Sequence, residues 1–167
     1  MDSIADVAIP AKGSAVVESE SSSSSTLIGW ADVTASIQGA VSGFEIMRLR
    51  QSGRPDSEVT VPLDPGGTFL TVPFDETAGF KTGVGIASQS GVSNINITVR
   101  DDKGNVLVNS QVPLAAFGHT AFFLSTMFPQ AANRRGIAEL QVTGGTIAGM
   151  GLRMSPSISF TAMPTVH

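Results

Sequence analysis

The stretch Asn-Ile-Asn-Ile-Thr-Val-Arg at residues 94–100 decides the fold class of this chain, because polar and apolar side chains alternate through it without a break. A period of two residues places Ile95, Ile97 and Val99 on one face of a β-strand and leaves the other face polar. The pattern therefore predicts a strand with one face in an apolar core.

A turn and a returning strand follow this stretch. Residues 101–105 contain Gly104, which can adopt the positive φ of a tight hairpin, and Val-Leu-Val comes next at 106–108. Turn-bounded segments of the same kind recur at residues 15–18, 27–35, 40–50, 58–62, 68–74, 81–88, 112–114, 120–124, 137–143, 146–154 and 157–163. About a dozen short strands, with one helical turn at 124–130, predict an all-β fold of antiparallel sheets packed as a sandwich.

Composition excludes several classes of function. The chain has 167 residues, a net charge of −4 and no cysteine, and only 14% of its residues are charged. Ten basic residues give no cationic surface for nucleic acid. No apolar run approaches the roughly 18 residues of a membrane helix, and the first 15 residues lack the pattern of a signal peptide. Disulfides, cysteine-ligated zinc and thiol nucleophiles are excluded as well.

The sequence contains an internal repeat. In the same order along the chain, residues 9–17 match 114–122, 29–33 match 136–140, 41–46 match 147–152 and 60–62 match 162–164. The offset stays between 102 and 107 residues in all four blocks, which indicates a duplication.

The repeat of about 105 residues has the size of one immunoglobulin-like sandwich. Residues 66–167 are expected to form a complete unit, and residues 1–65 correspond only to the later half of a preceding unit. Residues 19–25 form a serine-rich loop in this partial unit. Three arrangements can cover its apolar face: packing on the complete unit, a further N-terminal segment in the natural protein, or strands from another copy of the chain.

Several motifs carry a resemblance to a known family. They are Gly29-Trp30-Ala31, Gly43-Phe44-Glu45-Ile46, Gly53-Arg54-Pro55-Asp56-Ser57-Glu58, Phe80-Lys81-Thr82-Gly83-Val84, Gly118-His119-Thr120-Ala121-Phe122, Asn133-Arg134-Arg135-Gly136 and Gly151-Leu152-Arg153. Together they resemble a family of uncharacterised secreted β-sandwich proteins that is frequent in acidobacteria and related environmental bacteria. The resemblance implies export, a tandem sandwich and no assigned catalysis. Family members have a full first repeat behind a signal peptide, so the start at Met1 departs from the pattern.

The sequence offers weak candidates for catalysis. A hydrolytic triad needs a histidine beside a nucleophile, and the two histidines are His119, at a strand start, and His167, the last residue. Carboxylate pairs occur at 101–102, 75–76 and 56–58, where turns or a solvated face account for them. Asp101, Asp102 and Asn105 also lack the spacing of a calcium loop. We therefore expect no catalytic residue, no cofactor and no metal site.

Two polar motifs are expected to be structural. Arg54, Asp56 and Glu58 form the first, and Arg134 and Arg135 belong to the second. A guanidinium in such a motif ties loop carbonyls or carboxylates together. The alternative is a surface that binds acidic glycans.

The partial unit is the candidate interaction site. Residues 4–18 precede the serine-rich loop and have no complementary strands, so they are the candidate for a strand exchanged between copies. The candidate interface residues are Ile4, Val7, Ile9, Val16, Val17 and Trp30. This pattern predicts a non-enzymatic structural protein of the cell surface or extracellular space, a homo-oligomer or homopolymer assembled by edge-strand pairing.

Two other functions remain open from the sequence. A carbohydrate-binding or adhesion module of a larger exported protein would show a cluster of exposed aromatic side chains. A hydrolase would bring two carboxylates, or His119 and a nucleophile, into one cleft. Nucleic acid and a membrane span are not expected.

Overall fold

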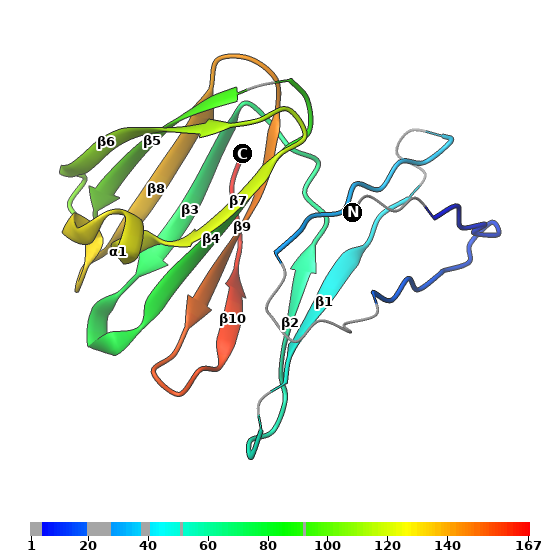
Figure 1. Ribbon diagram of the computed structural model, residues 1–167, viewed down its shortest axis with the longest axis horizontal. Coiled ribbons are helices and arrows are strands. Elements are labelled where there is room, and N and C mark those ends of the chain that lie inside the picture. The colour runs from blue at the N-terminus through cyan, green and yellow to red at the C-terminus, as the bar shows by residue number, and fades with distance from the viewer. Residues whose placement is uncertain (1–4, 20–27, 38–40, 51, 92) are drawn as a thin grey trace.

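The computed structural model describes residues 5–19, 28–37, 41–50, 52–91 and 93–167. The predicted all-β fold is confirmed, because antiparallel sheets packed as a sandwich make up the C-terminal part of the molecule (Figure 1). A separate two-stranded hairpin lies beside this sandwich, and the N-terminal segment lies on the same side of the molecule.

The sandwich has two four-stranded sheets. Sheet I has the order β3 (Phe69–Asp75), β8 (Arg135–Val142), β5 (Ser93–Asp101) and β6 (Val106–Leu114). Sheet II has the order β10 (Phe160–Met163), β9 (Ile147–Met154), β4 (Lys81–Ser88) and β7 (His119–Phe123). Every strand pair in both sheets is antiparallel.

The alternating stretch of β5 behaves as its pattern predicts. Ile95, Ile97 and Val99 are at most 1% exposed and face the apolar core between the sheets. Gly104 has a φ of 83° in the turn that leads to β6, where a side chain would be strained. The core cluster of the described residues draws all of its buried members from residues 70–147.

Two glycines let the sheets approach closely. A Cβ atom on Gly149 would lie 2.3 Å from Leu70 Cδ2, and one on Gly151 would lie 2.8 Å from Val72 Cγ1. Real Cβ atoms do not approach other carbons so closely, so a larger residue at either position would force the side chain of Leu70 or Val72 on β3 to move.

Among the described residues, helical structure is limited to short turns. They are η1 (Thr77–Gly79), α1 (Leu124–Met127) and η2 (Pro129–Ala131), and the last two confirm the helical turn predicted at 124–130. In the described ranges, no helix combines the length and apolar character that crossing a bilayer requires.

Two expected strands are absent from the structure. Residues 15–18 and 28–35 adopt no strand, although both were predicted as strands, and residue 27 lies outside the described ranges. A strand needs a paired neighbour for its backbone groups, and both segments lie in the N-terminal part, where the described residues supply no such neighbour. The segments 106–108 and 112–114 join into the single strand β6.

The N-terminal part has one regular element, the hairpin of β1 (Phe44–Leu49) and β2 (Ser57–Pro62). It packs with β2 beside β10 at one side of the sandwich (Figure 1). We call residues 5–63 the N-terminal unit and residues 66–167 the sandwich.

Candidate assembly surface

The two faces of the β1–β2 hairpin differ in burial. Met47 and Val59 are cross-strand partners on the inner face, where Val59 is 7% exposed. Phe44 and Ile46 lie on the outer face and are 64% and 57% exposed. The outer face therefore offers two large apolar side chains to solvent, and Pro62 lies opposite Phe44.

Polar contacts at the hairpin tip hold the inner face against the sandwich. Arg54 Nη1 donates to the carbonyl oxygen of Ser157 at 2.7 Å, and Phe160 N donates to Ser57 Oγ at 3.5 Å. Both contacts join the β1–β2 hairpin to the β9–β10 hairpin, whose turn contains Ser157. The hairpin thus has a defined side that faces away from the sandwich.

A second attachment lies at residues 28–30. Trp30 Nε1 donates to the carbonyl oxygen of Phe117 at 3.2 Å, and His119 Nε2 lies 2.9 Å from the carbonyl oxygen of Ile28. Trp30 is half-buried at this junction. This candidate interface residue therefore joins the N-terminal unit to the start of β7 within one chain.

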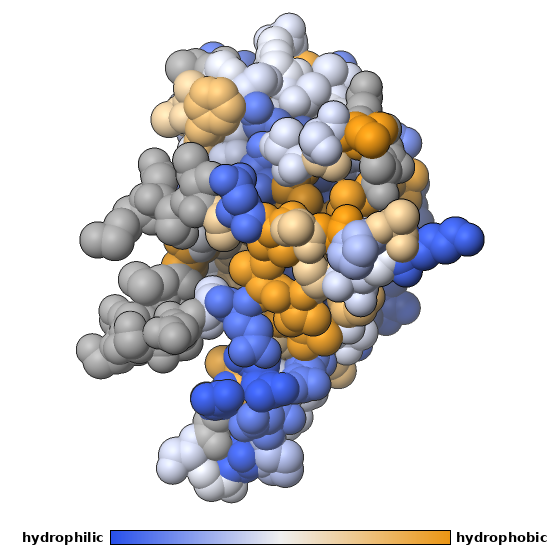
Figure 2. Space-filling model, turned by 90° about the vertical axis from the view of Figure 1, so that its right-hand side faces the viewer, coloured by the Kyte–Doolittle hydropathy of each residue, from blue (hydrophilic) through white to orange (hydrophobic). Residues whose placement is uncertain are grey.

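Exposed apolar side chains concentrate in the N-terminal unit. Eleven of the eighteen exposed large apolar residues among the described positions lie between residues 7 and 63. They are Val7, Ile9, Val16, Val17, Ile28, Val33, Ile37, Val41, Phe44, Ile46 and Leu63. Figure 2 views this side of the molecule and shows apolar atoms gathered at its centre. Exposed apolar side chains that gather on one side of a protein are typical of interaction surfaces.

Residues 5–19 are solvent-exposed throughout and form no helix or strand. Among the described residues, their backbone makes one hydrogen bond, from Gly13 N to the carbonyl oxygen of Pro10 at 2.8 Å, in a turn where Lys12 has a φ of 63°. Extended backbone without a partner strand has unused donors and acceptors for pairing. The segment can therefore take part in strand addition.

The structure places the candidate interface residues as follows. Val7 and Ile9 are 46% and 42% exposed, and Val16 and Val17 are 83% and 69% exposed. Ile4 lies outside the described residues. The sequence did not single out Phe44 and Ile46, although their alternation within 41–46 was a signal of a two-faced strand.

The first polar motif divides its contacts between two neighbours. Arg54 reaches Ser157 of the sandwich, whereas Asp56 Oδ2 lies 3.9 Å from Arg50 Nε and Glu58 pairs with Arg48 across the hairpin. The two ion pairs are exposed, and such pairs contribute little to stability.

The second polar motif lies around the turn of the β5–β6 hairpin. Arg134 Nη1 is 3.9 Å from Asp101 Oδ2, and Arg135 Nη2 is 3.4 Å from Thr77 Oγ1. The side-chain amide of Asn105 donates to Asp101 and lowers the pKa of that carboxyl below its ordinary value. The contact between Asn105 and Asp101 is typical of a tight turn.

The carboxylates at 75 and 76 have different roles. Asp75 accepts from the hydroxyl and backbone N–H of Thr77 at 2.6 and 3.0 Å, and the hydroxyl contact is the main cause of its lowered pKa. Glu76 is 2% exposed, and its Oε1 accepts from Thr82 N and Ser125 N at 3.1 and 3.2 Å. The interpretation of residue 76 as part of a solvated face is wrong, because this carboxylate joins β4 to α1 inside the protein.

His167 is held in a structural contact. Its Nε2 lies 2.7 Å from Asp64 Oδ1 and its Nδ1 lies 3.1 Å from the carbonyl oxygen of Phe69. The other Asp64 oxygen accepts from Gly149 N at 2.8 Å. Both ring nitrogens therefore lie against oxygen atoms of the protein itself. Across the described ranges, no group of three or more His, Asp or Glu side chains could hold a metal ion.

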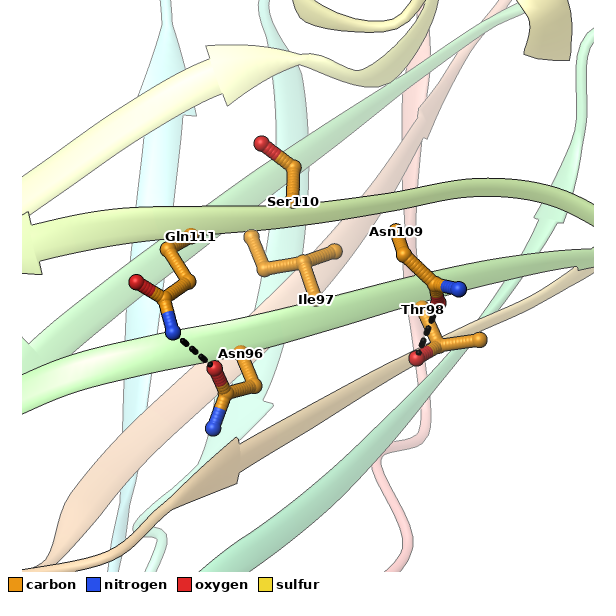
Figure 3. Close-up of a pocket in the computed structure, with 6 residues that line it drawn as sticks. All are labelled: Asn96, Ile97, Thr98, Asn109, Ser110 and Gln111. Carbon is orange, nitrogen blue, oxygen red and sulfur yellow. Dashed lines mark hydrogen bonds between the residues drawn. The ribbon is translucent and has the colours of Figure 1, made fainter.

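The outer face of sheet I carries a shallow groove of about 340 Å³ (Figure 3). Gln111 Nε2 donates to Asn96 Oδ1 at 2.8 Å, and Thr98 Oγ1 lies 3.0 Å from Asn109 Oδ1. The strand register places Gln111, Asn96, Gln141 and Phe69 side by side in one row across sheet I. Phe69, at the end of this row, is 39% exposed. A row of amides that ends at an aromatic ring has groups that bind sugar hydroxyls.

The other exposed aromatic rings are spread over the molecule. Phe44 belongs to β1, Phe117 to the turn before β7 and Phe123 to the end of β7. These residues and Phe69 belong to four different elements, and a flat aromatic platform for a glycan would combine rings from neighbouring positions.

No family model matches the chain, and no curated protein or solved structure is significantly similar to it. The resemblance to secreted β-sandwich proteins of acidobacteria therefore stays a prediction.

Proposed function

We propose that this protein is a non-enzymatic structural subunit that assembles with further copies of itself at the cell surface or outside the cell. The observation that carries the proposal is the concentration of exposed apolar side chains in the N-terminal unit. The buried side chains of the core cluster, in contrast, all belong to residues 70–147. Burial of a side chain such as Phe44 or Ile46 between copies would contribute roughly 1.5–3 kcal/mol.

The register of the two hairpins supports the duplication behind this proposal. The sequence match aligns Ile46 with Leu152 and Thr60 with Ala162. Ile46 pairs with Thr60 in the first hairpin, and Leu152 pairs with Ala162 in the second. The β1–β2 hairpin is then the counterpart of β9–β10, and within the described part of residues 5–63 it forms a two-stranded sheet of its own. A partial unit of this kind gains stability from a further copy.

The experiment compares self-association of matched variants. Light scattering after size-exclusion chromatography should show growth in mass with concentration for the wild-type chain, and the Phe44→Ser, Ile46→Ser double variant should associate more weakly. Met127→Ser is the control, because Met127 is 38% exposed on α1 of the sandwich. A wild-type chain that stays monomeric at high concentration would overturn the proposal.

The amide row of sheet I favours carbohydrate binding as a second candidate function. Asn96, Gln111 and Gln141 present polar groups beside Phe69 in one row. Affinity electrophoresis in polysaccharide gels tests this candidate. Retardation of the wild-type chain but not of an Asn96→Ala, Gln111→Ala variant would support it, and equal migration of both would remove it.

A further inference from the structure

The four outer edges of the sandwich differ in what covers them. The C-terminal segment bridges β3, where Thr71 and Val166 exchange two backbone hydrogen bonds of 2.8 and 3.1 Å. The hairpin strand β2 lies beside β10, and residues 28–30 contact the start of β7. The edge of β6 is the fourth, and η2 is the named element that lies near this strand besides its paired neighbour β5.

The edge strand β6 carries a bulge and a proline near its two ends but no charged side chain that would block pairing between them. Its sequence Val-Leu-Val-Asn-Ser-Gln-Val-Pro-Leu contains no charged residue. The pairing with β5 shifts by one residue at Val106–Val108, and Pro113 lacks a backbone donor. A bulge and a proline both stop strand pairing, so the edge between them, residues 108–112, is open over five residues.

The alternation of residues 5–9 suits this edge. Ala5, Val7 and Ile9 occupy one face of an extended segment, Asp6 and Ala8 occupy the other, and Pro10 ends it. On β6, Val108 and Val112 pack against the core, while Asn109 and Gln111 face the polar groove. An added antiparallel strand with Val7 opposite Ser110 would extend the apolar face with Ile9 and Ala5 and set Asp6 beside Gln111.

The N-terminal unit, which contains residues 5–9, and the edge strand β6 lie at opposite ends of the long axis of the molecule (Figure 1). This separation favours pairing between copies over pairing within one chain. Because donor and acceptor are different surfaces, each added copy presents a new open edge.

We propose that residues 5–9 of one copy add as an antiparallel strand to residues 108–112 of the next copy, which makes a head-to-tail polymer. The inference rests on the proposed self-assembly and names one donor strand and one acceptor edge for it, which are separate from the outer face of the β1–β2 hairpin. It is a β-augmentation, in which backbone hydrogen bonds supply affinity and the alternate side chains set the register.

Cysteine cross-linking tests the pairing, because the native chain contains no cysteine. The double variant Val7→Cys, Ser110→Cys should give a ladder of disulfide-linked multimers under mild oxidation, and each single variant should stop at dimers. The matched control is Val16→Cys, Ser110→Cys, because Val16 is more exposed than Val7. We expect about tenfold less multimer in the control, because disulfides need Cα atoms within about 7 Å.

The outcomes separate this inference from the proposed function. Wild-type polymers together with equal cross-linking in test and control variants would overturn the strand pairing and leave self-assembly standing. A monomeric wild-type chain would overturn both. If the Ser110 variants fail to fold, a fluorescent peptide of residues 5–11 serves instead. It should bind the wild-type chain, and a Val7→Lys peptide should not; equal binding of the two peptides would overturn the pairing.

Discussion

The β1–β2 and β9–β10 hairpins share a register and differ in their surroundings. The β9–β10 hairpin packs its inner face over a second sheet, where Gly151 meets Val72. The β1–β2 hairpin has Met47 and Val59 inward, and Phe44 and Ile46 exposed. A hairpin acquires a buried core from the strands around it, so the same local sequence pattern leads to a stable sheet in one place and an interaction surface in the other.

The largest expected effect contrasts the two regions directly. Leu70→Ala removes a fully buried side chain from the sandwich and should lower the free energy of unfolding by about 2–5 kcal/mol. Ile46→Ala should change it by less than about 0.5 kcal/mol, because Ile46 is 57% exposed in the isolated chain. Urea unfolding at low protein concentration measures both. A cost above 2 kcal/mol for Ile46→Ala would show that the hairpin is buried within one chain.

A smaller effect is expected at the buried carboxylate of the sandwich. Glu76→Gln keeps one side-chain oxygen acceptor but loses the charge that faces two backbone N–H groups, and should cost about 1–3 kcal/mol. Asp102→Asn is the control, since Asp102 is exposed. Thermal unfolding measures the difference. Equal unfolding temperatures would contradict a stabilising role for the charge of Glu76, whose Oε2 also lies 3.8 Å from Lys81 Nζ.

The attachment of the hairpin predicts a local effect. Arg54→Ala removes the hydrogen bond to Ser157 and should speed amide hydrogen exchange in β1 and β2, with about 1 kcal/mol or less lost from global stability. Arg50→Ala is the matched control, because Arg50 reaches only Asp56 in its own hairpin. Unchanged exchange in both variants would show that the apolar inner face alone fixes the hairpin.

The smallest expected effect is a dependence of stability on pH. The pKa of Asp75 is lowered mainly by the Thr77 hydroxyl, so its folded-state pKa lies below the unfolded value of about 3.9. The carboxylate then stabilises the fold above that value, and this contribution is lost as the pH falls through the folded pKa. Asp75→Asn should therefore weaken the fall in stability below pH 4, as acid titration of unfolding can measure. An unchanged slope would contradict this role.

Local patterns predicted the sandwich well. The strand at 81–88 and the inward residues of β5 follow from alternation, and Gly104 follows from turn chemistry. The burial of Glu76 could not be predicted, because it depends on Ser125, which is 49 residues away.

The N-terminal unit was harder to predict for a related reason. Residues 15–18 have strand-like side chains, but a strand forms only where a neighbour accepts its backbone hydrogen bonds. The alternation at Phe44 and Ile46 predicts a two-faced strand and leaves open which face meets the sandwich. Both outcomes depend on distant parts of the chain or on another copy.

The most direct test of self-assembly through the N-terminal unit is amide hydrogen exchange of the intact chain, measured by mass spectrometry at low and high concentration. Protection should rise with concentration in residues 5–63 and in β6, and stay constant in β4 and β9 of the sandwich. Exchange that does not depend on concentration anywhere in the chain would contradict it.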